Sequence, residues 1–141
     1  MTENPKRILL ADDDQSLREL MEMLLSAQGY SVHIANNGQE AIDAIQQTSF
    51  DLISLDLMMP VMDGIEVLTW IHTTQASAAP VVILTAVDQE RTINQLFEVG
   101  ASAVIHKPID VAHYIEQIEQ LLGEPNCSTI SCPLSYSLKA V

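Results

Sequence analysis

Basic side chains are scarce in this sequence. It holds 6 Lys and Arg against 19 Asp and Glu, and its formal net charge is −13 at pH 7. Nucleic-acid binding needs basic groups that neutralise phosphates, and a strongly negative protein repels that polymer. This charge balance therefore excludes a nucleic-acid-binding domain and predicts no nucleic-acid partner.

Long apolar runs are missing as well. The longest strand-like apolar run, Val81–Leu84, is far shorter than the roughly 18 residues that a membrane span needs. The first residues, Met1–Arg7, lack the basic and then apolar layout of a secretory signal. The expectation is a cytoplasmic protein that does not insert into a membrane.

Cysteine occurs only at Cys127 and Cys132. The two residues could form a disulfide, bind a metal with ligands from elsewhere, or stay as free thiols. For a cytoplasmic chain of this size, free thiols are the expectation. The histidines do not show the spacing of zinc ligands either; they are His33, His72, His106 and His113.

Apolar residues are plentiful, at 48% of 141, which predicts one folded domain and argues against a disordered chain. Short β-branched runs alternate with segments of helical periodicity. The predicted strands are Arg7–Ala11, Ser31–Ala35, Asp51–Asp56, Val81–Thr85 and Ala103–His106. The predicted helices surround Leu17–Leu25 and cover Gly38–Gln47, Gly64–Gln75, Asp88–Val99 and Val111–Leu122. Alternation of this kind predicts an α/β fold, a parallel sheet with helices on both faces.

Helix ends follow from capping residues. Asp88 and Asp110 are predicted to cap the fourth and fifth helices at their N-termini. Asp14 is predicted to open the first helix in the same way. Glycines are predicted to end the first, fourth and fifth helices, at Gly29, Gly100 and Gly123.

The last residues differ in character from the rest. Residues 124–141 contain Pro125, Pro133 and four serines, and they show no clear period. The sequence therefore predicts a domain over residues 1–123 and a tail over 124–141, which is too short to be an output domain.

Polar side chains follow the predicted strands at their carboxyl ends, where ligands bind in an open α/β sheet. They are Asp12 and Asp13 after the first strand, Asp56 at the end of the third, Thr85 at the end of the fourth and Lys107 after the fifth. We expect these carboxylates, one hydroxyl and one ammonium to converge on one edge of the sheet.

Carboxylates within ~4–6 Å of one another raise each other's pKa or require a counter-ion. Mg²⁺ suits such a site, because it favours one or two carboxylates, retained water and a phosphate oxygen. Lys107 supplies a compact charge for a phosphoryl oxygen, and Thr85 can donate to another. Together these groups predict phosphoryl transfer to Asp56, which would form an aspartyl phosphate.

The sequence resembles the receiver domain of two-component response regulators over roughly residues 5–123. The resemblance rests on Ile8–Asp14, Asp51–Gly64, Val81–Ala86, Gly100–Ala101 and Lys107–Pro108. It implies a flavodoxin-like fold with five parallel strands in the order 2-1-3-4-5.

The resemblance also implies residue roles. Asp12 and Asp13 would belong to the metal pocket, and the backbone carbonyl of Met58 would complete the Mg²⁺ shell. Asp56 would accept the phosphoryl group, with Thr85 and Lys107 contacting it. The Lys107–Pro108 peptide would be cis, a form that X-Pro bonds tolerate.

Two departures from the family pattern matter. Receivers often carry an aromatic switch residue three positions before the lysine, and this place is Val104. A rotating aromatic ring coupled to Thr85 is therefore excluded. The positions two after Asp56 and two after Thr85 are Met58 and Val87, and neither side chain can orient an attacking water. Slow spontaneous dephosphorylation is the expectation.

The resulting hypothesis is a stand-alone receiver, phosphorylated by a histidine kinase or a histidine phosphotransfer protein and acting through protein–protein contacts. It would catalyse only its own phosphoryl transfer and dephosphorylation. A phosphate-independent pseudo-receiver adaptor is the alternative. A phosphatase with an aspartate nucleophile is a further alternative. Such enzymes usually have a general acid two residues after the nucleophile, and here that residue is Met58, which argues against this class. A flavin carrier is excluded, because aspartates after the first strand repel a flavin phosphate.

Overall fold

The computed structural model describes residues 5–86 and 88–122. In this part of the chain, strands and helices alternate throughout. The strands are β1 (Arg7–Ala11), β2 (Ser31–Ala35), β3 (Leu52–Asp56), β4 (Val81–Thr85) and β5 (Ala103–His106). The helices are α1 (Gln15–Ala27), α2 (Gly38–Gln47), α3 (Gly64–Thr74), α4 (Glu90–Val99) and α5 (Val111–Leu122).

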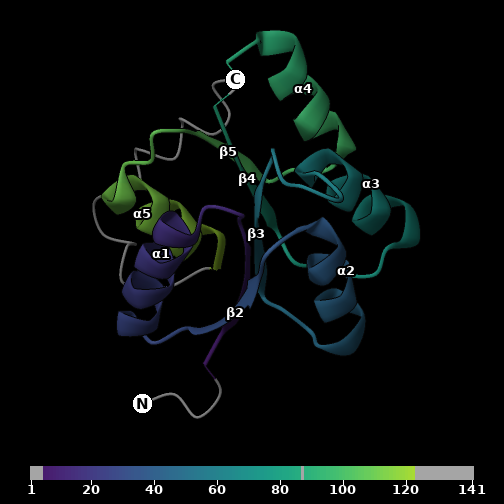
Figure 1. Cartoon of the computed structure of the whole chain (residues 1–141). Helices are drawn as coiled ribbons and strands as arrows, with labels where there is room; N and C mark the ends of the chain where they lie inside the picture. The colour runs from purple at the N-terminus through teal and green to yellow at the C-terminus, as the bar shows by residue number, and fades with distance from the viewer. Residues whose placement is uncertain (1–4, 87, 123–141) are drawn as a thin grey trace.

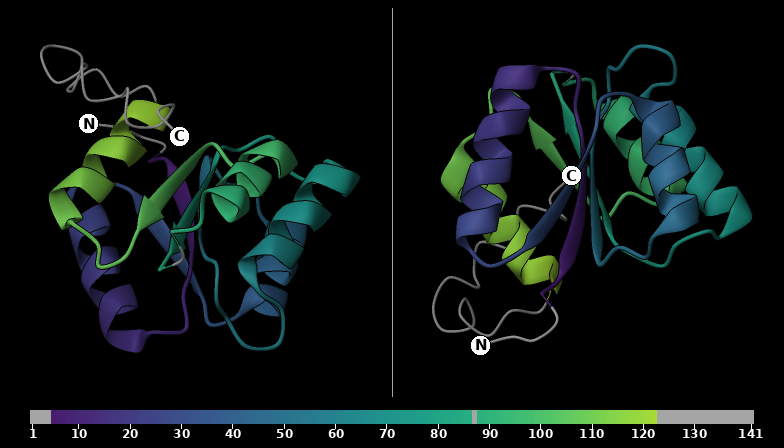
Figure 2. Two further views of the ribbon diagram at one scale, coloured as in Figure 1. Left: turned by 90° about the horizontal axis from the view of Figure 1, so that it is seen from above. Right: turned by 60° about the horizontal axis from the view of Figure 1, so that its bottom comes forward.

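The strands form one parallel sheet in the order β2-β1-β3-β4-β5, which confirms the predicted topology. Helices α1 and α5 cover one face and α2, α3 and α4 cover the other (Figures 1 and 2). Because both faces are covered, β3 and β4 are buried along their whole length.

Side chains alternate between the two apolar layers along each strand. On β3, Leu52 packs in the layer under α1 and α5, whereas Ile53 and Leu55 pack in the opposite layer. Continuing this alternation places Asp56 on the α1 and α5 side at the carboxyl edge of the sheet. The core thus fixes the direction of the polar groups that end the strands.

The predicted bounds of four strands are confirmed, and β3 is shorter by one residue. Asp51 lies just before β3, where its carboxylate accepts a 2.8 Å hydrogen bond from the main-chain N–H of Arg7. Helix α3 also ends one residue early, because Gln75 has a left-handed backbone with φ 54°.

The predicted cap of α4 is wrong. Helix α4 begins at Glu90 after Gln89, which makes no side-chain capping bond, so Asp88 is not its N-cap. The other aspartate caps are confirmed. Asp14 accepts from the N–H of Leu17 at 3.2 Å, and Asp110 accepts from the N–H of Ala112 at 3.1 Å.

Some predictions fall outside the described residues. They concern Val87, Gly123, Cys127, Cys132 and the tail over 124–141, so the proposed domain boundary stays a prediction. Among the described helices, none combines the length and the apolar character required to traverse a lipid bilayer.

Candidate functional site

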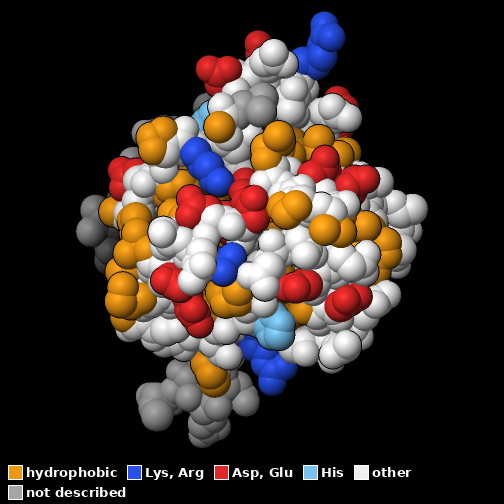
Figure 3. Space-filling model, in the orientation of Figure 1, with side chains coloured by type: hydrophobic (Ala, Val, Ile, Leu, Met, Phe, Trp, Pro, Cys, Tyr) orange, Lys and Arg blue, Asp and Glu red, His pale blue; other side chains and the backbone are white. Residues whose placement is uncertain are grey.

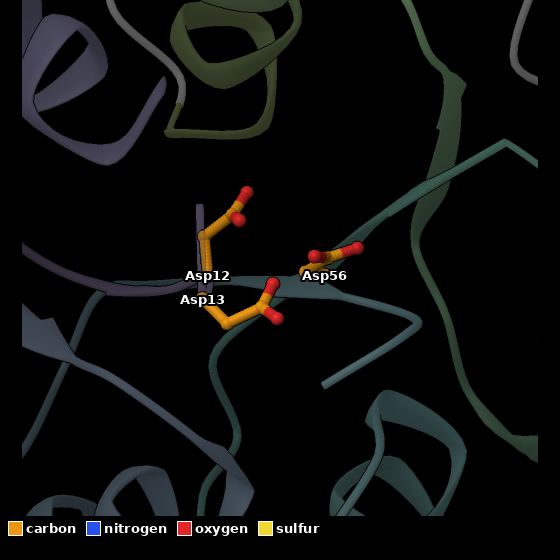
Figure 4. A group of neighbouring side chains, drawn as sticks. All are labelled: Asp12, Asp13 and Asp56. Carbon is orange, nitrogen blue, oxygen red and sulfur yellow. The ribbon is translucent and has the colours of Figure 1, made fainter. Parts of the chain in front are cut away.

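The ends of β1 and β3 bring the predicted acidic residues together. Ala11 of β1 lies opposite Leu55 of β3, so the following residues, Asp12 and Asp56, are neighbours. Asp12, Asp13 and Asp56 each offer a carboxylate oxygen within 4.8 Å of the others (Figure 4). Asp12 and Asp56 are buried, at 0% and 3% exposed, whereas Asp13 is open to solvent.

The acidic cluster reaches the surface through Asp13. Figure 3 shows acidic side chains gathered near the middle of the face in view, with basic side chains beside them. Asp13 is the member of the cluster that is open to solvent, so a cation or an incoming ligand would approach the buried carboxylates of Asp12 and Asp56 from its side.

Lys107 provides the positive charge that the sequence predicts here. Its Nζ lies 3.1 Å from Oδ1 of Asp56 and 3.8 Å from Oδ2 of Asp12. The Lys107 main-chain N–H donates to the carbonyl oxygen of Thr85 at 2.8 Å, and the Lys107–Pro108 peptide is cis as predicted. Pairing to β4 thus holds the lysine at the end of β5.

Thr85 and Met58 both lie close to Asp56 in the fold. Leu84 of β4 pairs with Asp56, and Thr85 follows it as a buried residue at the end of the strand. The main-chain N–H of Met58 donates to Oδ1 of Asp56 at 3.3 Å, and the Met58 side chain is 64% exposed. The Met58 backbone therefore lies beside the carboxylate, where the sequence predicts a carbonyl ligand.

The loop between β1 and α1 contains a contact that sequence analysis missed. Nη1 of Arg18 donates to the main-chain oxygen of Asp12 at 2.7 Å. The main-chain N–H of Asp14 donates to Oδ1 of Asp12 at 2.9 Å. Arg18 had one signal in the sequence: it is the only Lys or Arg between Arg7 and Arg91.

The loop between β3 and α3 is held tightly behind Asp56. A Cβ atom on Gly64 would lie 2.7 Å from the main-chain oxygen of Asp56, so only glycine allows this approach. Asp63 and Glu66 form a capping box that starts α3. The Asp63–Gly64 pair thus has the structural role of a turn into a helix.

Burial and crowding shift the pKa of Asp56. The pKa of Asp56 is raised from 3.8 to about 6, first by burial and then by the nearby carboxylate of Asp12. The hydrogen bond and charge of Lys107, with the N–H of Met58, act in the opposite direction. One lysine therefore compensates only part of the negative charge of the cluster.

The residues present fit a divalent cation. Oδ2 of Asp12 is buried and has no hydrogen-bond partner among the described residues, and it lies in a cluster of carboxylates. Hard oxygen donors of this kind suit Mg²⁺. Asp12, Asp13 and Asp56, with the Met58 carbonyl, are the groups that would hold the ion.

Comparisons with known proteins identify the family. The model of the response regulator receiver domain matches residues 8–119. Transcriptional regulatory protein SrrA of Staphylococcus aureus is 34% identical over 123 residues, which cover 87% of this chain and 50% of that protein. The chain thus belongs to the response regulator receiver domain family of two-component systems. It spans about half the length of SrrA.

Solved receiver structures share the fold. The receiver domain of the Francisella response regulator 1452 has a TM-score of 0.80 at 28% identity, over 85% of this chain and 98% of that one. A CheY-like receiver domain protein from Methanospirillum hungatei JF-1 has a TM-score of 0.80 at 29% identity, over 86% and 96%. Vibrio cholerae chemotaxis protein CheY4 has a TM-score of 0.78 at 27% identity, over 84% and 99%. Receivers are signalling phosphoacceptors that typically bind Mg²⁺ at an aspartate cluster.

Proposed function

We propose that this chain is a phosphorylation switch whose phosphoacceptor is Asp56. The phosphoryl group would come from a histidine kinase or a histidine phosphotransfer protein. One observation carries this proposal: the buried Asp56 carboxylate lies beside the carboxylates of Asp12 and Asp13 and 3.1 Å from the Lys107 ammonium. The family of the chain supports the same reaction.

In the proposed reaction, a carboxylate oxygen of Asp56 attacks the phosphorus of a phosphohistidine. The new O–P bond forms as the N–P bond breaks. The electron pair of the N–P bond stays on the donor imidazole, which takes up a proton from solvent and leaves as neutral histidine. Bound Mg²⁺ would neutralise charge on the phosphoryl oxygens. Lys107 would move from the carboxylate to a phosphoryl oxygen, and the Thr85 hydroxyl would donate to another.

The switch would act through protein–protein contacts in the cytoplasm, where histidine kinases obtain phosphoryl groups from ATP. Phosphorylation adds charge to a site where β3, β4 and β5 end together. Surfaces that continue from these strand ends are where a partner would detect the change. With Val104 on β5, this response would not use a rotating aromatic ring at that position.

The alternative is a pseudo-receiver that binds partners without phosphate. An adaptor of this kind needs no cation site and no lysine. The ion pair between Lys107 and Asp56, and the buried Oδ2 of Asp12 that accepts no hydrogen bond from the described residues, therefore favour the switch. A turnover phosphatase is disfavoured as well, because Met58 cannot act as a general acid.

Intact mass after incubation with Mg²⁺ and acetyl phosphate tests the proposal. Wild type should gain the mass of one phosphoryl group, and Asp56→Asn should gain none. Asp43→Asn is the matched control, because it makes the same chemical change on the exposed side of α2. An unmodified wild type would favour the adaptor. Steady release of phosphate from many substrates would favour an enzyme.

A further inference from the structure

The guanidinium of Arg18 donates its hydrogen bond to a main-chain oxygen and not to a carboxylate. It is a part-buried cation close to an acidic cluster, yet its short hydrogen bond goes to a main-chain oxygen, that of Asp12, at 2.7 Å. Among the described residues, Arg18 forms no ion pair with a carboxylate, and the ion pairs of the acidic cluster are both made by Lys107. The Arg18 cation thus lies close to the aspartate cluster without pairing with any of its carboxylates.

The position of this bond matters for the residue that follows. The carbonyl of Asp12 belongs to the peptide that joins Asp12 to Asp13, and that peptide is planar. A bond to its oxygen therefore fixes the plane from which the Asp13 side chain departs. Asp13 is the exposed member of the cluster.

A second contact holds the other side of the same loop. Asp14 donates its main-chain N–H to Oδ1 of Asp12 and caps α1 through Leu17. Arg18 lies in the first turns of α1, so its bond ties the start of the helix back to the end of β1. The helix and the strand thus hold the acidic loop from both ends.

We propose that Arg18 is a positioning residue for the divalent-cation site, acting through the Asp12 carbonyl to hold the Asp13 carboxylate in place. This proposal rests on the proposed function, since it assumes that the aspartate cluster binds Mg²⁺. Residues that do not touch the metal but orient its ligands through hydrogen bonds typically contribute about 10–100-fold to metal affinity.

The sign of the effect separates positioning from simple electrostatics. Loss of a positive charge beside a cation site tightens cation binding if charge alone matters. Loss of the bond that orients Asp13 weakens it. Arg18→Met keeps an apolar stem and removes both the charge and the donor, so we expect the Mg²⁺ dissociation constant to rise about tenfold.

Isothermal titration calorimetry of the full chain with MgCl₂, in the absence of any phosphodonor, measures this constant directly. Arg18→Lys keeps a positive charge and N–H donors on a long side chain, and it should restore most of the lost affinity. Arg91→Met is the matched control: it removes an exposed positive charge on α4, and its Mg²⁺ affinity should not fall. Thermal unfolding without Mg²⁺ should show each variant folded. If Arg18→Met does not fold, Arg18→Ala, which also removes both the charge and the donor, carries the same expectation.

The outcomes are distinct. If wild type binds Mg²⁺ and Arg18→Met binds it equally or more tightly, Arg18 does not position the site and the proposed function stands. A folded Arg18→Lys as weak as Arg18→Met would also overturn the positioning role. If wild type itself binds no Mg²⁺, or Asp13→Asn binds it as wild type does, the cation site fails, and the role of Arg18 fails with it.

Discussion

Lys107 and Asp56 form an ion pair across the carboxyl edge of the sheet, with Nζ 3.1 Å from Oδ1 and Asp56 only 3% exposed. The pair joins β5 to β3 across β4. Asp12 brings a second buried carboxylate to the same ammonium at 3.8 Å. Two carboxylates thus share one lysine, and this shortage of positive charge underlies the chemistry of the site.

Removal of this ammonium should raise the pKa of Asp56 above its value of about 6. Lysine favours the charged carboxylate through both a hydrogen bond and its charge, and Lys107→Met removes both. Titration of the Asp56 carboxyl carbon by NMR in Mg²⁺-free buffer measures the change. Lys6→Met, an exposed site, is the control. A lower or unchanged pKa in Lys107→Met would contradict the assignment of the ion pair.

The metal-free protein should lose stability as the pH rises through about 6. The folded state holds the Asp56 proton more tightly than the unfolded state, since the pKa rises from 3.8 to about 6. This contribution to stability is complete below about pH 4 and is lost as Asp56 ionises in the folded state. At about 1.4 kcal/mol per pKa unit, the free energy of unfolding should fall by roughly 1–3 kcal/mol.

Urea unfolding at several pH values, without Mg²⁺, tests this dependence. Wild type and Asp56→Asn should differ in the slope of unfolding free energy against pH between about pH 4 and pH 6.5, because asparagine has no proton to release. Parallel profiles for the two proteins would show that Asp56 has an ordinary pKa.

Val61→Asn should stabilise the protein. Val61 has φ 70°, a left-handed conformation that disfavours a β-branched residue, and it is 77% exposed. The N–H of Met62 donates to the oxygen of Pro60 at 2.7 Å and closes a three-residue turn around Val61. Asparagine occurs at positive φ several-fold more often than other residues that have a side chain, so we expect a gain of about 1 kcal/mol in urea unfolding. Val61→Ile should show no gain; an equal gain there would rule out backbone strain as the cause.

Gln117→Leu should also stabilise the protein, by about 1–3 kcal/mol. Gln117 lies on α5 with 0% exposure, and neither amide atom has a hydrogen-bond partner in the described part of the chain. Tyr114→Phe is the contrasting change, because the Tyr114 hydroxyl donates to Oγ of Ser54 at 2.9 Å and its loss should destabilise. Chemical unfolding compares both with wild type. Destabilisation by Gln117→Leu would mean that the buried amide is satisfied, for example by water.

Met58→Asn should shorten the lifetime of the phosphorylated protein. Met58 is two residues after Asp56 and its side chain is exposed at the site, but a thioether cannot orient an attacking water. An amide can hold water by hydrogen bonds. Loss of the phosphoryl mass after removal of acetyl phosphate gives the rate. Met58→Leu, which keeps an apolar side chain, should lose the phosphoryl group at the wild-type rate. Equal rates in wild type, Met58→Asn and Met58→Leu would show that Met58 does not cause slow dephosphorylation.

Much of the fold was predictable because it depends on local patterns of apolar residues, which can be recognised without knowing the contacts between distant parts of the chain. The buried runs of β1 and β4 and the periodicity of α5 need no distant partner to be recognised. The start of β3 was placed one residue too early, because the Asp51 carboxylate bonds to the Arg7 main chain, a contact between residues far apart in sequence. Asp88 has the residue type of a cap, but α4 starts two residues later without one.

The candidate site was predictable for a related reason. Parallel strands place their carboxyl ends at one edge, so Asp12, Asp56 and Lys107 follow from the strand assignments alone. Arg18 did not follow, because the path of a long side chain back to the Asp12 carbonyl depends on its rotamer and on the start of α1. The raised pKa of Asp56 likewise depends on burial that only packing determines.

Chemical trapping of the modified residue tests the central claim most directly. Borohydride reduces an aspartyl phosphate to homoserine, so peptide mass mapping after incubation with Mg²⁺ and acetyl phosphate locates the acceptor. The account predicts homoserine at position 56, dependent on Mg²⁺. Homoserine at position 12 or 13 instead, or at no aspartate, would contradict it.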